Sequence, residues 1–237
     1  MNVNDLRIKI FADGADLASL LKLAERPYIK GFTTNPTLMR KAGIIDYEAF
    51  AKQVLEKITD RPISFEVFSD DFDDMARQAR RISTWGSNIY VKIPVTNTKR
   101  ESAAPLITRL SHDGLKLNVT ALMTIEQVRT VGTALNGGAP AIVSVFAGRM
   151  ADTGCDPIPV MQEALLVLKE CPGAELLWAS PRELLNIVQA DQIGCDIITV
   201  TSDILGKLSQ LGKDLTDFSL ETVKMFYDDA HAAGFVL

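Results

Sequence analysis

The sequence contains few residues that commonly bind metals or form disulfides. Its three cysteines, Cys155, Cys171 and Cys195, are odd in number and show no paired motif. That pattern favours reduced thiols, as in a cytoplasm. The two histidines, His112 and His231, are isolated in the sequence. We therefore expect neither a metal site nor a Ser/His/Asp triad.

Long apolar runs and a strong net charge are also lacking. No stretch reaches the ~20 apolar residues that a membrane-spanning helix needs. The formal net charge of −5 argues against a general affinity for nucleic acid or for anionic membranes. Residues 1–7 lack the charged and apolar regions of a signal peptide. We expect a cytoplasmic protein whose partners include no nucleic acid and no membrane.

The chain alternates apolar runs of strand type with amphipathic stretches of helical type. Eight strands, each followed by a helical stretch, predict a parallel sheet, and 237 residues suit one closed (β/α)8 barrel of the α/β class. A doubly wound open sheet is the alternative, but the first strand is not followed by Gly-x-Gly-x-x-Gly and the chain has no Walker phosphate loop. We predict a single domain over residues 1–237, with 216–237 as an additional C-terminal helical tail. The predicted strands lie near residues 7–12, 29–34, 62–68, 88–94, 115–120, 140–146, 174–179 and 195–200.

Lys92 stands in the middle of an apolar, β-branched run, Ile-Tyr-Val-Lys-Ile-Pro-Val. Lysine is almost never fully buried unless another group compensates for its charge. An apolar site favours the neutral amine, which attacks carbonyl carbons and forms Schiff bases. The structural alternative is a lysine that reaches outward or pairs with a carboxylate. The strand alone favours that alternative, but the rest of the chain favours a reactive amine.

Polar residues stand at the ends of the first seven predicted strands. In a (β/α)8 barrel the chemistry takes place at the carboxyl ends of the strands. Each residue also has a structural interpretation: Asp13 could cap the first helix, Glu66 and Lys92 could form an ion pair, and the arginines could lie at the surface. Together, however, an amine, two carboxylates, hydroxyls, amides and guanidinium groups suit covalent amine catalysis on an anionic, hydroxylated substrate. The polar residues are Asp13, Thr33, Thr34, Asn35, Glu66, Lys92, Asn118, Thr120, Ser144, Arg149, Ser180 and Arg182.

These residues lie in motifs that resemble the transaldolase family, which includes short bacterial transaldolases and fructose 6-phosphate aldolases. The resemblance runs from about Lys9 to Lys207. The Thr-Thr-Asn-Pro segment and the lysine of the fourth strand are specific in combination. The motifs are Phe-Ala-Asp13, Gly31-Phe-Thr-Thr-Asn35-Pro-Thr37, Ser64-Phe-Glu66-Val, Val91-Lys92-Ile-Pro, Leu117-Asn118-Val-Thr120, Ser144-Val-Phe146-Ala-Gly-Arg149 and Ala179-Ser180-Pro-Arg182.

The resemblance implies a (β/α)8 barrel in which Lys92 forms the Schiff base and Asp13 acts as acid and base at the substrate C4 hydroxyl. It implies that Glu66 and Thr120 hold a catalytic water. It implies no metal and no other cofactor. The substrate-binding residues that it implies are Asn35, Asn118 and Ser144 for the hydroxyls, Arg149, Ser180 and Arg182 for the phosphate, and Thr33 and Phe146 beside them.

The activity implied is transfer of a three-carbon dihydroxyacetone unit between sugar phosphates, as in the pentose phosphate pathway. The donor would be a ketose phosphate such as fructose 6-phosphate or sedoheptulose 7-phosphate, and the acceptor an aldose phosphate. Glu66, Phe146 and Ser144 follow the transaldolase pattern, whereas the aldolases place a glutamine and a tyrosine at the first two positions. Pro181, where the family usually has an aromatic residue, leaves the substrate details open, including a sulfonate in place of the phosphate.

Other functions remain as alternatives. The nearest is a fructose 6-phosphate aldolase that releases free dihydroxyacetone. A deoxyribose-phosphate aldolase also uses a barrel lysine, but the Thr-Thr-Asn-Pro segment argues against it. A non-catalytic sugar-phosphate sensor is the alternative from another class. Short members of the family tend to form ring-shaped decamers, so we also expect a homo-oligomer, such as a decamer, joined through the helix predicted over 216–235.

Overall fold

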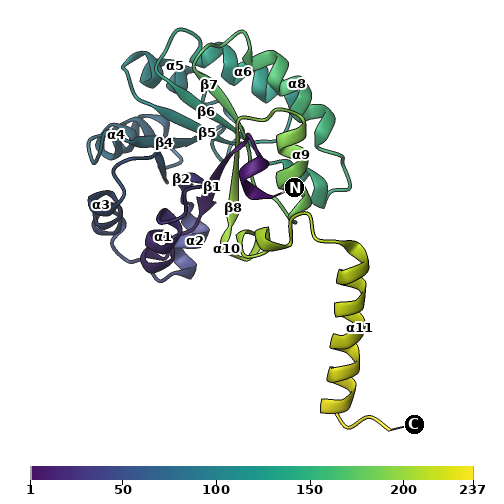
Figure 1. Ribbon diagram of the computed structural model, residues 1–237. Coiled ribbons are helices and arrows are strands. Elements are labelled where there is room, and N and C mark those ends of the chain that lie inside the picture. Colours follow the sequence, from purple (N-terminus) through teal and green to yellow (C-terminus); the bar gives the residue numbers. More distant parts are fainter. Residues whose placement is uncertain (1, 237) are drawn as a thin grey trace.

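The computed structural model describes residues 2–236, so Met1 and Leu237, the ends of the predicted domain, lie outside the described residues. Eight parallel strands form a closed barrel in the order of the sequence, and helices surround it (Figure 1). The predicted (β/α)8 fold is confirmed. The strands are β1 (Lys9–Asp13), β2 (Ile29–Thr33), β3 (Ile63–Glu66), β4 (Ile89–Pro94), β5 (Leu117–Leu122), β6 (Ala141–Val145), β7 (Ala174–Trp178) and β8 (Ile197–Thr201).

Side-chain caps define where several of the helices begin. Asp16, not Asp13, caps the first helix, because its carboxylate accepts a hydrogen bond from the Ser19 amide at 2.8 Å. Asn35 caps α2 in the same way, through Leu38 at 2.9 Å. The helices are α1 (Leu17–Ala24), α2 (Pro36–Lys41), α3 (Tyr47–Lys57), α4 (Phe72–Ser83), α5 (Ala104–His112), α6 (Ile125–Leu135), α7 (Ala147–Asp152), α8 (Ile158–Leu168), α9 (Leu185–Gln192), α10 (Ser202–Leu205) and α11 (Leu215–Ala232), with 3-10 turns at Val3–Asp5 and Leu208–Gln210.

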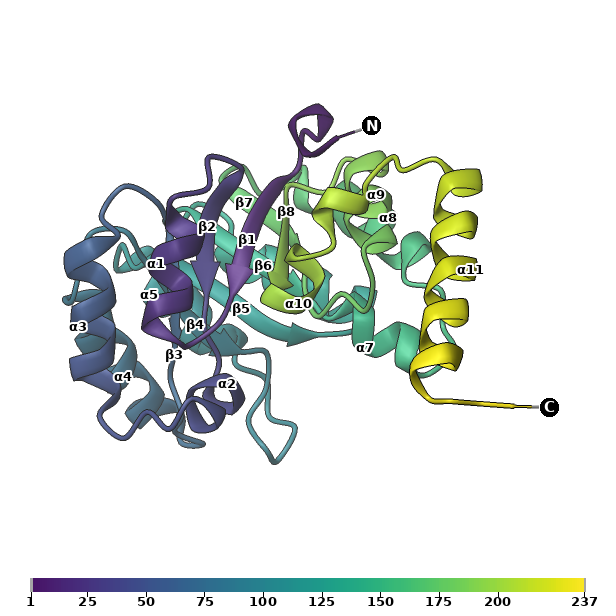
Figure 2. The ribbon, with the colours of Figure 1, turned by 60° about the horizontal axis from the view of Figure 1, so that its bottom comes forward.

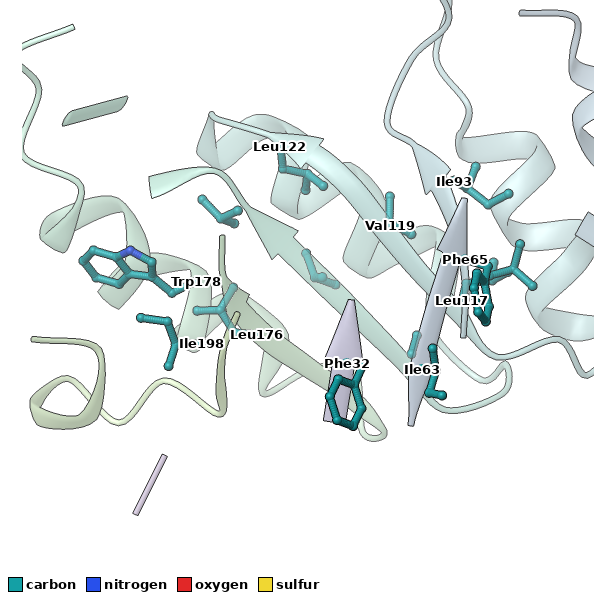
Figure 3. Packing of buried hydrophobic residues seen from close by; sticks show 14 of the residues in the cluster. Phe32, Ile63, Phe65, Ile93, Leu117, Val119, Leu122, Leu176, Trp178 and Ile198 are labelled. Atoms are coloured by element: carbon teal, nitrogen blue, oxygen red, sulfur yellow. The ribbon is translucent and has the colours of Figure 1, made fainter. Parts of the chain in front are cut away.

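The main hydrophobic core lies between the strands and the surrounding helices. Figure 3 shows part of it, where Phe65 and Ile93 pack among other buried apolar side chains. Both are fully buried. Because side chains alternate along a strand, the residues next to them, Glu66 and Lys92, point to the other face of the sheet, into the barrel.

Inside the barrel, a small apolar cluster forms a floor beneath the polar side chains. It consists of Phe11, Ile142, Leu177, Ala179 and Ile197. The Phe11 ring fits because β2 has a glycine opposite it: a Cβ on Gly31 would lie 2.6 Å from the ring. This apolar cluster fills part of the barrel interior, and the polar residues line a cavity at the carboxyl ends of the strands.

The last helix, α11, extends away from the barrel (Figures 1 and 2). None of its described residues is buried. Large apolar side chains such as Phe226 and Tyr227 are more than 60% exposed. Across residues 2–236, no helix is long and apolar enough to cross a membrane.

Candidate active site

A cavity of about 620 Å³ opens at the carboxyl ends of the strands. Every catalytic and substrate-binding residue that the family resemblance implies lines it, from Asp13 on β1 to Arg182 after β7, whereas Thr34 is buried beside it. The structure therefore brings together residues that are up to 169 positions apart in the sequence. Thr37, Leu38 and Lys41 of α2, Ala121 of β5, and Thr199, Thr201, Asp203 and Ile204 from β8 and α10 also line it.

Lys92 lies on β4 with only 7% of its surface exposed. Its Nζ is 3.1 Å from the Glu66 carboxylate and donates a hydrogen bond of 2.9 Å to the Thr34 carbonyl oxygen. Glu66 and Lys92 are direct partners in the β3–β4 register. The ion pair satisfies the buried charge, and the same contact gives the amine a nearby base that can accept its proton.

Asp13 ends β1 and receives two hydrogen bonds from β2 and the turn after it. The Thr33 hydroxyl donates to Oδ1 at 2.8 Å, and the Asn35 amide donates to Oδ2 at 3.3 Å. Burial raises the pKa of the Asp13 carboxyl above its ordinary value, while the charge of Lys92 and these hydrogen bonds lower it by less. A raised pKa brings a carboxyl closer to the range in which it can both accept and release a proton.

A chain of buried hydrogen bonds joins β6, β5 and β3 across the barrel interior. The Ser144 hydroxyl donates to Asn118 Oδ1 at 2.7 Å, and Asn118 Nδ2 donates to Ser64 Oγ at 3.0 Å. All three side chains are nearly inaccessible to solvent. The network fixes the amide and the hydroxyl on the cavity wall, so both are held in place before any ligand binds.

Thr120 shares the parity of Asn118, so it faces the barrel interior and lines the cavity beside an irregular stretch of β5. Its register against β6 shifts between Val119 and Leu122, and Ala121 adopts a left-handed φ of 66°. The Thr120 hydroxyl oxygen is buried and has no hydrogen-bond partner among residues 2–236. A buried polar atom that faces a cavity without a protein partner is a place for a water or a ligand atom.

The two arginines reach the cavity from the ends of β6 and β7 in different environments. The Arg149 guanidinium lies 5.7 Å from the centre of the Phe146 ring. Arg182 is held side-on by Asp152, with Nε 2.8 Å from Oδ1 and Nη2 bonded to Oδ2. Its Nη1 also donates to the carbonyl and hydroxyl oxygens of Ser180 at 2.9 and 2.8 Å.

Ser180 has a left-handed backbone, with φ of 62°. Its carbonyl oxygen closely approaches Gly148 in the first turn of α7, where a Cβ would lie only 1.5 Å away. Gly148 donates its amide to Ala179 across the same contact at 3.3 Å. Glycine at position 148 thus allows the loop after β7 to lie against α7, which brings Ser180 and Arg149 to one side of the cavity.

Sequence reasoning missed several residues that contribute to the site. Thr199 on β8 lines the cavity and bonds to Thr33. It could have been found by extending the strand-end argument to the eighth strand. Tyr47 of α3 gave no sequence signal: its hydroxyl donates to the Glu66 carbonyl and accepts from the Glu66 amide, at 2.8 and 2.7 Å. Asp152, which holds Arg182, was also missed.

Within residues 2–236 no group of three or more His, Cys, Asp or Glu side chains could hold a metal ion.

Comparison with known proteins identifies the family. A sequence model described as Transaldolase/Fructose-6-phosphate aldolase matches residues 10–236. The chain belongs to this family. A "probable transaldolase" of Dehalococcoides mccartyi is 34% identical over 204 residues, which cover 86% of this chain and 91% of the relative. Another, from Thermoanaerobacter sp., is 32% identical over 96% of this chain and 99% of its own.

Solved structures support the fold of this transaldolase/aldolase family member. A 3-hexulose-6-phosphate synthase from Salmonella typhimurium superposes with a TM-score of 0.57 at 15% identity, covering 84% of this chain and 91% of its own. A dihydrodipicolinate synthase from Rhodopseudomonas palustris gives a TM-score of 0.55 at 16% identity, covering 98% of this chain and 81% of its own. At these identities the likeness concerns the barrel alone.

Proposed function

We propose that the protein is a Schiff-base transaldolase, with Lys92 as the nucleophile. The observation that carries the proposal is the buried Lys92 amine at the cavity floor, 3.1 Å from the Glu66 carboxylate. The donor is a ketose phosphate such as fructose 6-phosphate or sedoheptulose 7-phosphate, and the acceptor is an aldose phosphate. Family membership and the curated relatives' names support the transaldolase class.

Imine formation requires a neutral amine and the removal of water. Glu66 accepts a proton from Lys92, and the amine adds to the ketone carbon of the donor. Thr120 and Glu66 hold the water that leaves as the carbinolamine becomes an iminium ion. The unpartnered Thr120 hydroxyl supports this role, since it has both a hydrogen and lone pairs to offer to a water.

Cleavage follows because the iminium ion withdraws electrons from the neighbouring bond. Asp13 removes the proton of the C4 hydroxyl, the C3–C4 bond breaks, and an aldehyde phosphate leaves. The electron pair of that bond forms a three-carbon enamine on Lys92. Asn35, Asn118 and Ser144 bind the hydroxyls of the bound fragment. A positioned acid and base contributes roughly 10²–10⁴-fold to such steps.

The anionic tail of the substrate binds between the ends of β6 and β7. Arg149, Ser180 and Arg182 supply guanidinium and hydroxyl donors there, which are suited to phosphate oxygens. After cleavage the enamine attacks the carbonyl carbon of an acceptor aldehyde phosphate that binds in the same place. Asp13 returns its proton to the new C4 oxygen, and water hydrolyses the resulting iminium ion to release the product and Lys92. The Phe146 ring beside this position has no proton to donate to the enamine, which favours transfer over hydrolysis.

Borohydride trapping tests the nucleophile. Incubation with fructose 6-phosphate followed by reduction should fix a three-carbon adduct on Lys92, which peptide mass spectrometry locates. Lys92→Met should abolish the adduct and the activity. Lys41→Met is a matched control, because Lys41 lines the same cavity, and this variant should still be labelled at Lys92. Labelling elsewhere, or full activity of Lys92→Met, would disprove the assignment.

A second assay separates the transferase from the aldolase. Fructose 6-phosphate is supplied with and without erythrose 4-phosphate, and sedoheptulose 7-phosphate and free dihydroxyacetone are both measured. A transaldolase forms the seven-carbon product much faster than it releases dihydroxyacetone. Comparable rates of formation of the two products would identify an aldolase. Formation of neither product would favour a sugar-phosphate sensor.

A further inference from the structure

The eighth strand, which pairs with the strand of Asp13, contributes a hydroxyl to the site. Thr199 lies on β8, whose neighbour in the closed barrel is β1, and its side chain is only 7% exposed. Its hydroxyl is hydrogen-bonded to the Thr33 hydroxyl on β2. The Thr33 hydroxyl in turn donates to Asp13 Oδ1 at 2.8 Å. The three side chains thus form a hydrogen-bonded chain among three adjacent strands, of which β1 lies between β8 and β2.

The direction of this chain follows from counting hydrogens. A hydroxyl has one hydrogen to donate, and an ionised carboxylate can only accept. Thr33 must therefore give its hydrogen to the ionised Asp13. The hydrogen between the two threonines then belongs to Thr199, which donates to Thr33. Each donor polarises the next, so the bond that reaches the charged carboxylate is strengthened.

We infer that Thr199 is a positioning residue for Asp13, acting through Thr33 to stabilise the ionised carboxylate. The inference rests on the proposed function, in which ionised Asp13 removes the C4 hydroxyl proton. It gives the eighth strand a defined part in the reaction. It also explains why a hydroxyl pair stands here: when Asp13 is protonated, both hydroxyl hydrogens can turn the other way and Thr199 becomes the acceptor.

Other groups act on Asp13 from the remaining strands, and they set the background for the test. Lys92 on β4 lowers its pKa, Glu66 on β3 raises it, and the Asn35 amide lowers it. Asp203 of α10 lines the same cavity. Removing the Thr199 hydroxyl changes none of these charges, so a change in the titration of Asp13 reports on the hydroxyl chain.

Thr199→Val removes the hydroxyl and keeps the branched shape of the side chain. Removing the hydroxyl destabilises the ionised Asp13 more than the protonated Asp13, because hydrogen bonds to a charged group are stronger than those to a neutral one. The acid limb of the pH profile of kcat/KM for fructose 6-phosphate should therefore move upward by about 0.5 pH unit. Below that limb the variant should be roughly three-fold slower than the wild type, and well above it the two should be equal.

Three further variants complete the experiment. Thr199→Ser keeps the hydroxyl and should restore the wild-type profile. Thr199→Ala is a second deletion and should shift the limb in the same direction as Thr199→Val. Ser111→Ala is the control for loss of a buried hydroxyl. Ser111 lies in α5 and does not line the cavity, and its Oγ has no hydrogen-bond partner among residues 2–236. This variant should leave the profile unchanged.

A direct titration separates failure of this inference from failure of the proposed function. The carboxyl carbon of Asp13 can be followed by NMR after ¹³C labelling of aspartate, with Asp13→Asn to assign the resonance. Its midpoint should rise in Thr199→Val whether or not the protein turns over this substrate. An unchanged midpoint, a uniform loss of rate with an unchanged pH profile, or a Thr199→Ser variant that behaves like Thr199→Val would overturn the inference. No turnover by the wild type at any pH would instead overturn the proposed function.

Discussion

At the scale of single residues, we propose that Phe146 favours transfer of the three-carbon unit over its hydrolysis. Its ring lines the cavity next to Arg149 and carries no group that can donate a proton or bind water. Hydrolysis of the enamine requires both a proton on carbon and a water at the imine. The identity of this one side chain therefore bears on whether the three-carbon unit waits for an acceptor.

Phe146→Tyr should increase dihydroxyacetone release from fructose 6-phosphate, by about ten-fold, and reduce transfer to erythrose 4-phosphate. The phenolic hydroxyl adds an acid that can protonate the enamine, a step worth roughly 10²-fold when well placed. Both products are measured in one coupled assay. Phe146→Leu serves as the control, since it alters the shape without adding a hydroxyl and should not raise release. If the wild type already releases dihydroxyacetone as fast as it transfers it, this view of Phe146 is wrong.

The arginines at the tail of the substrate site should contribute to binding of phosphorylated substrates only. Arg149→Ala or Arg182→Ala should raise KM for fructose 6-phosphate by about 10–100-fold, as expected for loss of a charge-assisted hydrogen bond. Activity with non-phosphorylated fructose should change little. Arg129→Ala is the control, because Arg129 forms a surface ion pair with Glu163. Equal losses on both substrates would assign the arginines a structural role.

At the scale of elements, short helices after the strands hold the site in shape. The first turn of α7 lies against the loop after β7, and Gly148 makes that approach possible. Tyr47 at the start of α3 takes the place of a strand partner for Glu66, since its hydroxyl satisfies both backbone groups of that residue. Packing between elements, and not the strands alone, therefore determines where the Glu66 carboxylate and the Ser180 hydroxyl lie.

Gly148→Ala should lower the free energy of unfolding by about 3 kcal/mol, because its Cβ would overlap the Ser180 carbonyl oxygen, a backbone atom. The same displacement should raise KM for phosphorylated donors. Gly132→Ala in α6 is the matched control: its Cβ would meet Leu168 at an ordinary 3.5 Å. That variant should gain about 0.5–1 kcal/mol from the better helix propensity of alanine. Urea unfolding of both variants provides the measurement, and equal stabilities would contradict the contact.

At the scale of the whole molecule, α11 has no partner within the described chain. Its exposed apolar side chains include Leu215, Val223, Phe226 and Tyr227. A helix with this much exposed apolar surface on a separate arm is suited to packing against a second copy. We propose that the protein is a homo-oligomer, such as a decamer, joined through α11.

Light scattering at micromolar concentration should give a mass several times that of the 25.9 kDa chain. Removal of residues 214–237 should reduce the mass to that of one chain, and Phe226→Asp should weaken assembly because it places a charge on the apolar surface. Lys224→Ala, at an exposed polar position of the same helix, should have no effect. A monomeric full-length protein would rule out this assembly.

The sequence by itself determined the architecture and predicted most of the residues that line the cavity. The alternation of apolar runs with amphipathic stretches predicted every strand of the barrel, because the periods of 2 and 3.6 are local properties of the chain. The ends of those predicted strands then supplied Lys92, Glu66, Asn118 and Ser144 as candidates, and all four line the cavity. The motifs around them carried the resemblance to the family that the comparison confirmed.

Only the tertiary structure decided how these groups meet. The pairing of Arg182 with Asp152, of Tyr47 with the Glu66 backbone and of Thr199 with Thr33 each joins elements that are far apart in the sequence. No local pattern encodes such contacts, since they depend on the closure of the barrel and on the register between neighbouring strands. Closure places β8 beside β1, and for that reason the hydroxyl of Thr199 can reach, through Thr33, the carboxylate of Asp13 near the other end of the chain.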